Sequence, residues 1–278
     1  MTSIVLALSA ALSWGVSDFL GGLVSRRVSI ASLLTISHLV GFLGFLGVAL
    51  ITREPLPEAH YLWRATVTSL LALIGIVAFF RGMVVGRMSV VAPLSATGSI
   101  VPVVAGLAMG EQASAWQILG IALALLGIVV VSRATTTDQG PSGASSVGYA
   151  LLAAAAFGLF FLLVRWSSEA SVIWSLVVMR GTSLTLLILY ALVRRHDFTM
   201  PPRLLGTILV QGSIEGAANV FFAFATQTGL VSVVAVLASL FPVVTTVLAR
   251  LFLSERLSRS QQAGVVSALA GVILISAH

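Results

Sequence analysis

The sequence contains no cysteine, no lysine and little charge of either sign. Without cysteine, the chain can form no disulfide, no thiolate metal site and no cysteine nucleophile. Charged residues make up 9% of the 278 positions, whereas about 25% is typical of soluble domains. Hydrophobic residues make up 58%, and the mean hydropathy is +1.10. These values exclude a water-soluble globular protein and indicate an integral membrane protein.

Sequence motifs of enzymes and of nucleotide-driven pumps are also missing. The chain has no His-Glu-x-x-His motif, no Gly-Lys-Ser/Thr phosphate loop and no Gly-x-Ser-x-Gly nucleophile elbow. Its nine Asp and Glu residues are too scattered to form a metal cluster. We therefore expect no enzymatic activity, no cofactor, no metal site and no ATP-driven transport by this chain alone.

The apolar residues form long continuous runs, which favour membrane helices over the short alternating strands of a β-barrel. A small-residue run opens the chain, and polar or Pro-containing breaks separate the later runs. Ser114-x-x-Gln117 and Ser258-x-x-Gln261 have the pattern of helix-capping boxes. The ten helices predicted from this pattern span about 4–24, 31–51, 62–85, 89–109, 115–132, 147–165, 172–193, 203–225, 231–253 and 259–276.

The two halves of the chain repeat each other. The segment at 89–94 recurs at 232–237, an offset of 143 residues. Because each copy holds five helices, the second copy must enter the membrane upside down. The predicted fold is an all-α integral membrane protein with ten transmembrane helices in two inverted five-helix repeats. We place the repeats at 1–134 and 147–278 and a polar, cytoplasmic linker at 135–146.

All 15 basic residues are arginine, and they give a net charge of +6. All except Arg180 lie at or near the ends of apolar segments rather than on one patch, so nucleic acid is not an expected partner. Eleven of them lie on or beside loops after odd-numbered helices. Only Arg53, Arg64 and Arg165 lie on the opposite side. Because arginine-rich loops stay in the cytoplasm, both termini are predicted to be periplasmic in a bacterial inner membrane.

Four ionisable residues fall at membrane depth, away from the ends of the predicted helices: Asp18, His38, Arg180 and Glu215. Such residues are costly at membrane depth, so each is a candidate functional group. Arg180 and Glu215 could pair as a structural lock, or they could hold the carboxylate and amine of a zwitterion. Gating or proton-linked roles are the hypotheses for Asp18, His38 and Arg180. A simple hydrogen bond to a neighbour is the alternative for His38, and an interfacial position is the alternative for Asp18.

Polar and aromatic residues share faces of the first, sixth and eighth predicted helices. Within each helix these residues are three or four positions apart, so they lie on one face. Such a face could line either a cavity or a helix interface. We favour the cavity because all three helices show the pattern, with hydroxyls of the fourth helix added. The predicted substrate-binding residues are Trp14, Ser17, Ser95, Thr97, Ser99, Phe157, Phe161, Glu215, Asn219 and Phe222.

Prolines interrupt the fourth and ninth predicted helices, which occupy corresponding places in the two halves. Pro93 and Pro102 lie in the fourth helix and Pro242 lies in the ninth. Proline removes a backbone hydrogen bond and kinks a helix. Matched interruptions are typical of transporter binding sites, so these three prolines are predicted hinges; a static kink is the alternative.

The doubled five-helix repeat, the Ala11–Gly15 start, the segment from Phe80 to Ala92, and Pro242 followed by Ser254-Glu255 occur together in this order. In these features the chain resembles the EamA-type, ten-helix branch of the drug/metabolite transporter superfamily over about residues 4–276. The resemblance implies a secondary transporter that exports small metabolites. It also implies similarity to bacterial exporters of amino acids, including aromatic ones.

The expected function is therefore export of amino acids by alternating access. The expected partners are a small-molecule substrate and the lipid bilayer, and the chain could act as a monomer. One alternative is a sugar or nucleotide-sugar carrier of the same superfamily, which would need more cationic groups in the cavity. Another is a non-transporting membrane scaffold or a lipid-modifying enzyme, which would need a catalytic cluster on one membrane face.

Overall fold

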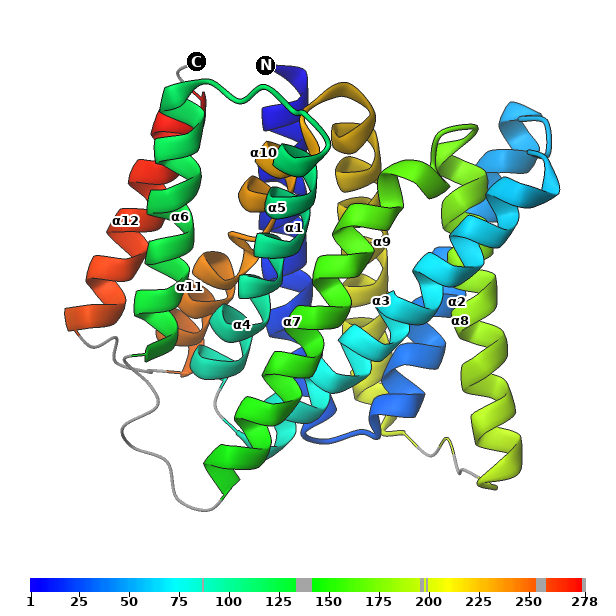
Figure 1. The fold of residues 1–278 in the computed structure, drawn as a ribbon. Coiled ribbons are helices and arrows are strands. Elements are labelled where there is room, and N and C mark those ends of the chain that lie inside the picture. Colours follow the sequence, from blue (N-terminus) through cyan, green and yellow to red (C-terminus); the bar gives the residue numbers. More distant parts are fainter. Residues whose placement is uncertain (87, 134–141, 196–197, 199, 254–258, 277–278) are drawn as a thin grey trace.

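The computed structural model describes residues 1–86, 88–133, 142–195, 198, 200–253 and 259–276. Within these ranges the regular structure is entirely helical (Figure 1). The elements are α1 (Thr2–Ser25), α2 (Ile30–Thr52), α3 (Ala59–Val85), α4 (Met88–Ala96), the 3₁₀ helix η1 (Thr97–Ser99), α5 (Ile100–Ala108), α6 (Ala115–Arg133), α7 (Ser142–Ser167), α8 (Val172–Val193), α9 (Pro202–Thr228), α10 (Val231–Ala238), α11 (Phe241–Leu253) and α12 (Arg259–Ser276).

Eight helical segments of the described chain are long and apolar enough to cross a membrane. Two of the eight are composite: Val91–Ala108 joins α4, η1 and α5, and Val231–Phe252 joins α10 and α11. The predicted fifth and tenth helices correspond to α6 and α12. Described residues of α6 supply only a shorter apolar segment, Ala115–Gly127. The all-helical membrane fold is confirmed, but ten spans are not.

Helix ends follow the local sequence signals where the structure describes them. Ser114 and Gln117 form the predicted capping box: the backbone N–H of each donates to the side chain of the other, at 2.9 and 3.2 Å. The matching box at Ser258 lies outside the described residues. The sixth predicted helix begins earlier than expected, since α7 already starts at Ser142, within the predicted linker. Most of that linker, 135–141, also lies outside the described ranges.

The fourth and ninth predicted helices are broken at matched positions. Helix α4 gives way to a 3₁₀ turn at Thr97–Ser99, and α10 ends at Ala238, before α11 begins at Phe241. Pro102 and Pro242 lie in the first turns after these breaks, where proline forfeits no helical hydrogen bond. Pro93 instead lies inside α4. Two of the three prolines therefore follow a break and one lies before it, and the use of all three as hinges stays a prediction.

The two halves pack as an inverted pair. Helix α1 runs downward from the top of Figure 1, whereas its counterpart α7 runs upward. Helix α1 packs against α9, and the equivalent pairing of α7 with α3 is made on the other side; α2 packs against α8, and α6 against α12. Every one of these pairs joins one repeat to the other. The core therefore forms between the repeats rather than within each of them.

Two equivalent glycines allow the close approach of the broken helices. A Cβ atom on Gly15 of α1 would lie 2.7 Å from the backbone oxygen of Phe241 at the start of α11. A Cβ atom on Gly158 of α7 would lie 2.5 Å from the backbone oxygen of Gly98. The hydroxyl of Thr245 also donates to the backbone oxygen of Gly15, at 3.1 Å. These glycines therefore place the middle of α1 and α7 directly on the break of the opposite repeat.

Glycines also join the peripheral pair α6 and α12. A Cβ atom on Gly120 would lie 2.7 Å from the backbone oxygen of Gly271, and one on Gly271 would lie 2.7 Å from the backbone nitrogen of Ala124. Figure 1 shows these helices side by side at one edge of the bundle. Small residues permit such contact between helices in a membrane.

We expect Gly120→Val to lower the free energy of unfolding by about 1–3 kcal/mol, because the added side chain must force two backbones apart. Thermal unfolding in detergent measures this loss. Gly44→Val is the matched control, because a Cβ atom at Gly44 of α2 meets nothing within 4 Å. Equal stability of the two variants would contradict the close packing of α6 on α12.

Candidate functional site

A cavity of about 70 Å³ lies at the centre of the bundle, near the middle of the long helices. It forms where α1, α2, α3, α7, α8 and α9 face one another beside the start of α11. The lining residues are Trp14, Asp18, His38, Ser69, Ala72, Ile76, Phe157, Phe160, Phe161, Leu176, Met179, Arg180, Ser183, Glu215, Asn219 and Phe241.

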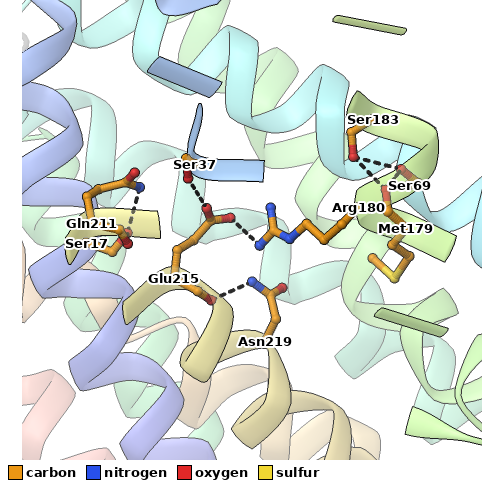
Figure 2. Close-up of polar contacts among 9 residues, drawn as sticks. All are labelled: Ser17, Ser37, Ser69, Met179, Arg180, Ser183, Gln211, Glu215 and Asn219. Carbon is orange, nitrogen blue, oxygen red and sulfur yellow. Dashed lines mark hydrogen bonds and ion pairs between the residues drawn. The ribbon is translucent and has the colours of Figure 1, made fainter. Parts of the chain in front are cut away.

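A buried ion pair crosses one side of the cavity (Figure 2). Nη2 of Arg180 on α8 donates to Oε1 of Glu215 on α9, at 2.8 Å. The Ser37 hydroxyl on α2 donates to the other carboxylate oxygen of Glu215, at 3.0 Å. The side-chain amide of Asn219 donates to the backbone oxygen of Glu215, at 2.7 Å. Of the two sequence hypotheses for Arg180 and Glu215, the structure shows them paired with each other.

Two glycines position this ion pair. Gly41 of α2 leaves room for the stem of Arg180, since a Cβ atom there would lie 3.2 Å from Nε of the guanidinium. Gly212 of α9 lies against Ser37, since a Cβ atom would lie 2.8 Å from the Ser37 Cα. The close contact of α9 with α2 brings the Ser37 hydroxyl within reach of Glu215. One turn away, the Gln211 amide donates to the Ser17 hydroxyl at 2.9 Å.

A second polar group lies on the opposite side of Arg180 in Figure 2. The hydroxyls of Ser69 on α3 and Ser183 on α8 both donate to the backbone oxygen of Met179, each at 2.6 Å. Sequence reasoning missed both serines. Their only signal is a single small polar residue at the middle of an apolar helix, which is equally typical of helix packing.

Aromatic rings pack at the cavity in two related groups. Trp14 lies 5.2 Å from Phe222 and 5.7 Å from Phe161, between ring centroids. The repeat offset of 143 relates the first of these pairs to Phe157 and Phe79, whose centroids lie 5.9 Å apart. Phe222 lies towards the upper end of α9 and Phe79 towards the lower end of α3. The cavity therefore has an aromatic pair on each side, related by the inversion of the repeats.

The two repeats line the cavity unequally. Glu215 and Asn219 of α9 correspond, by the same offset, to Ala72 and Ile76 of α3. Asp18 of α1 corresponds to Phe161 of α7. At these three equivalent positions α1 and α9 carry polar or charged side chains, whereas α3 and α7 carry apolar ones; Trp14 of α1 and Ser69 of α3 also line the cavity.

The cavity gathers half of the predicted substrate-binding residues and all three predicted gating residues. Trp14, Phe157, Phe161, Glu215 and Asn219 line it, together with Asp18, His38 and Arg180. The structure does not bring the other predicted residues to the lining. Ser17 bonds to Gln211, and Phe222 lies behind Trp14.

The hydroxyls of the broken helix also lie outside the cavity lining. Ser95, Thr97 and Ser99 each donate to a backbone oxygen three residues earlier, at 2.9, 2.7 and 2.9 Å. Each hydroxyl is therefore satisfied by the backbone of its own helix, a local bond that serine and threonine commonly make. Their polarity therefore supports the bend in the helix itself.

Replacing Arg180 with methionine should lower the free energy of unfolding by about 3–5 kcal/mol, because the Glu215 carboxylate would stay buried without its partner. The double variant Arg180→Met/Glu215→Met should recover most of this loss. Arg64→Met is the control: its pair with Glu169 is about half exposed, so its loss should be at most about 1 kcal/mol. Thermal unfolding in detergent compares them; a double variant as unstable as Arg180→Met would argue against the buried pair.

Comparisons with known proteins agree with this architecture. A solved structure, described as a crystal structure of a protein, has the same fold, with a TM-score of 0.77 and 14% sequence identity over 99% of this chain and 96% of that one. The uncharacterised protein MJ1333.1 of Methanocaldococcus jannaschii is 26% identical over 133 residues, which are 47% of this chain and 96% of that protein. The model of the EamA-like transporter family matches twice, at residues 1–133 and 144–277. With both repeats matched, the chain belongs to the EamA-like transporter family and is a membrane transporter rather than an enzyme.

Proposed function

We propose that this transporter exports amino acids, including aromatic ones, from the cytoplasm across a bacterial inner membrane. The unequal lining of the central cavity carries the proposal. Asp18, Glu215 and Asn219 line the cavity together with apolar residues such as Ile76 and Phe161. A ligand that suits both kinds of lining has charged groups at one end and an apolar group at the other. Free amino acids with apolar side chains have this form.

The size of the cavity implies rearrangement during binding. A volume of about 70 Å³ has room for a few water molecules, each of which needs at least about 10–15 Å³ by this measure. An aromatic side chain fits only when rings around the cavity move apart. Phe161 and Phe160 pack on Phe222, with centroids 5.0 and 6.1 Å away. Movement of this cluster would admit the side chain of the substrate.

Alternating access follows from the inverted repeats in this proposal. At the upper end in Figure 1, the Glu111 carboxylate accepts hydrogen bonds from the backbone N–H groups of Val231 and Ser232, at 2.7 and 3.1 Å. Arg165 donates to the backbone oxygen of Gly229, at 3.1 Å. The Glu111 bonds join the repeats, proposed at 1–134 and 147–278, at that end. Arg165 and Gly229 both belong to the second repeat, and their bond ties α7 to the end of α9 there. Opening of the upper end would break these contacts, while the lower end of the bundle, which the inversion of the repeats relates to it, would close.

A carrier of sugar phosphates or nucleotide sugars is supported less well. Phosphate groups are usually bound by arginine or lysine side chains. Among the described residues that line the cavity, Arg180 is the only such cation, and Glu215 already neutralises it. Amino acids need no further cation, because their own ammonium group balances their carboxylate.

In proteoliposomes, the purified protein should exchange labelled phenylalanine, tryptophan or leucine for the same unlabelled amino acid. Trp14→Ala, Asn219→Ala and Glu215→Gln should each lower transport without preventing membrane insertion. Loss of a buried charged contact costs about 2–5 kcal/mol. Trp63→Ala is the control for Trp14→Ala, because Trp63 is 65% exposed near the start of α3. Wild-type rates in all three variants would show that the cavity does not bind substrate.

The proposed orientation places both termini in the periplasm. The start of α1 and the end of α12 lie at the same side of the bundle (Figure 1). The arginine asymmetry assigns that side to the periplasm. A reporter that is active only in the cytoplasm should therefore give no signal when it is fused to the C-terminus, although an insertion after Arg26 should give one. The reverse pattern would overturn the orientation.

A further inference from the structure

Asp18 differs from every other charged residue at the cavity. Its side chain lines the cavity one helical turn from Trp14 and is 6% exposed. Within the described ranges of the chain, the carboxylate has no hydrogen-bond donor and no ion-pair partner. The hydroxyl of the neighbouring Ser17 is engaged by Gln211 on α9. Asp18 therefore presents a buried, unpaired carboxyl group to the cavity.

The other charged groups at the cavity do not compensate Asp18. Helix α9 contributes Glu215, and α8 contributes Arg180, which pair with each other at 2.8 Å. Helix α2 contributes His38, whose two ring nitrogens are both buried without a partner. The described lining residues of α3, α7 and α11 are not titratable. With His38 neutral, the lining carries one uncompensated negative charge.

A lone carboxylate inside a membrane protein is strongly destabilised until something neutralises it. Two agents can do so here: a proton, which forms the neutral acid, or a cationic group of a ligand. Both occupy the same oxygen atoms, so they exclude each other. The ammonium group of an amino acid is such a cation, and the apolar lining residues of α3 and α7 would receive its side chain.

We propose that Asp18 binds the ammonium group of the substrate and a proton in alternation, so that export is coupled to proton entry. This inference rests on the proposed function. Substrate arriving from the cytoplasm displaces the proton of Asp18 into the cytoplasm. Release of the substrate on the other side leaves the Asp18 carboxylate free. The carboxylate then takes up a proton from the periplasm and carries it back to the cytoplasmic side. One substrate leaves and one proton enters in each cycle.

The stoichiometry follows from the inequality of the repeats. The position equivalent to Asp18 is Phe161, so the second repeat adds no matching carboxyl group. Glu215 stays paired with Arg180 and bonded to Ser37, so it does not need a proton. A single exchangeable proton therefore accompanies each substrate.

Proteoliposomes separate this coupling from transport itself. With equal pH on both sides, exchange of tritiated L-phenylalanine tests the proposed function. With an imposed pH gradient, wild-type protein should accumulate phenylalanine in the more acidic compartment, and Asp18→Asn should not. Proton competition should also raise the wild-type KM as pH falls, approaching tenfold per pH unit. The KM of Asp18→Asn should be independent of pH, whereas Asp18→Glu should keep both the accumulation and the pH dependence.

Glu169→Gln is the matched control, because it also turns a carboxylate into an amide but at the exposed pair with Arg64. It should behave as wild type. If wild-type protein exchanges phenylalanine but a pH gradient drives no accumulation, the coupling is wrong and the proposed function stands. If no amino acid is exchanged, infrared titration of the protein without substrate tests whether Asp18 binds a proton. A protonated-carboxyl band present in wild type and Glu169→Gln but absent in Asp18→Asn supports the proton site, and its absence from wild type overturns it.

Discussion

The structure depends on one constraint: the hydrocarbon core of a membrane offers no hydrogen-bond partner. Every polar group placed there must find its partner within the protein or in a hydrated cavity. Arg180, Glu215 and Ser37 satisfy one another across three helices, α8, α9 and α2. Ser69 and Ser183 converge on one backbone oxygen of α8. These contacts hold both repeats around a small central space.

The same constraint separates structural polarity from functional polarity. Hydroxyls at the helix breaks bond locally, and the central ion pair bonds across helices, so neither is left to seek a ligand. Asp18 and His38 are the exceptions at the cavity. Among the described residues, neither the Asp18 carboxylate nor the His38 ring nitrogens have a hydrogen-bond partner. A buried polar group without a partner calls for an explanation, and a change of partners during function is one such explanation. The cavity therefore combines a rigid polar frame with a few groups that remain available.

Much of the architecture could be predicted from the sequence because its signals are periodic. The membrane helices, the two repeats, the matched helix breaks and the depth of Arg180 and Glu215 all follow from spacing and hydropathy. Ser69 and Ser183 could not be found in this way, because one small hydroxyl in an apolar helix looks the same at a cavity and at a packing contact. Ser95, Thr97 and Ser99 were placed at the cavity although they bond to their own helix. A hydroxyl on a helix can turn to its own backbone or to a cavity, and the sequence pattern is the same in both cases.

The close packing of Gly15 against the start of α11 has a consequence for how the protein is synthesised. The contact joins residues near the two ends of the chain, so the ribosome must deliver nearly all of the second repeat before it forms. Until then the first five predicted helices lie in the membrane without the surfaces that complete them, since their principal helix pairs are with the other half. The two repeats therefore assemble late in synthesis. Until then the first repeat must remain in the membrane without forming incorrect helix contacts through its small-residue faces.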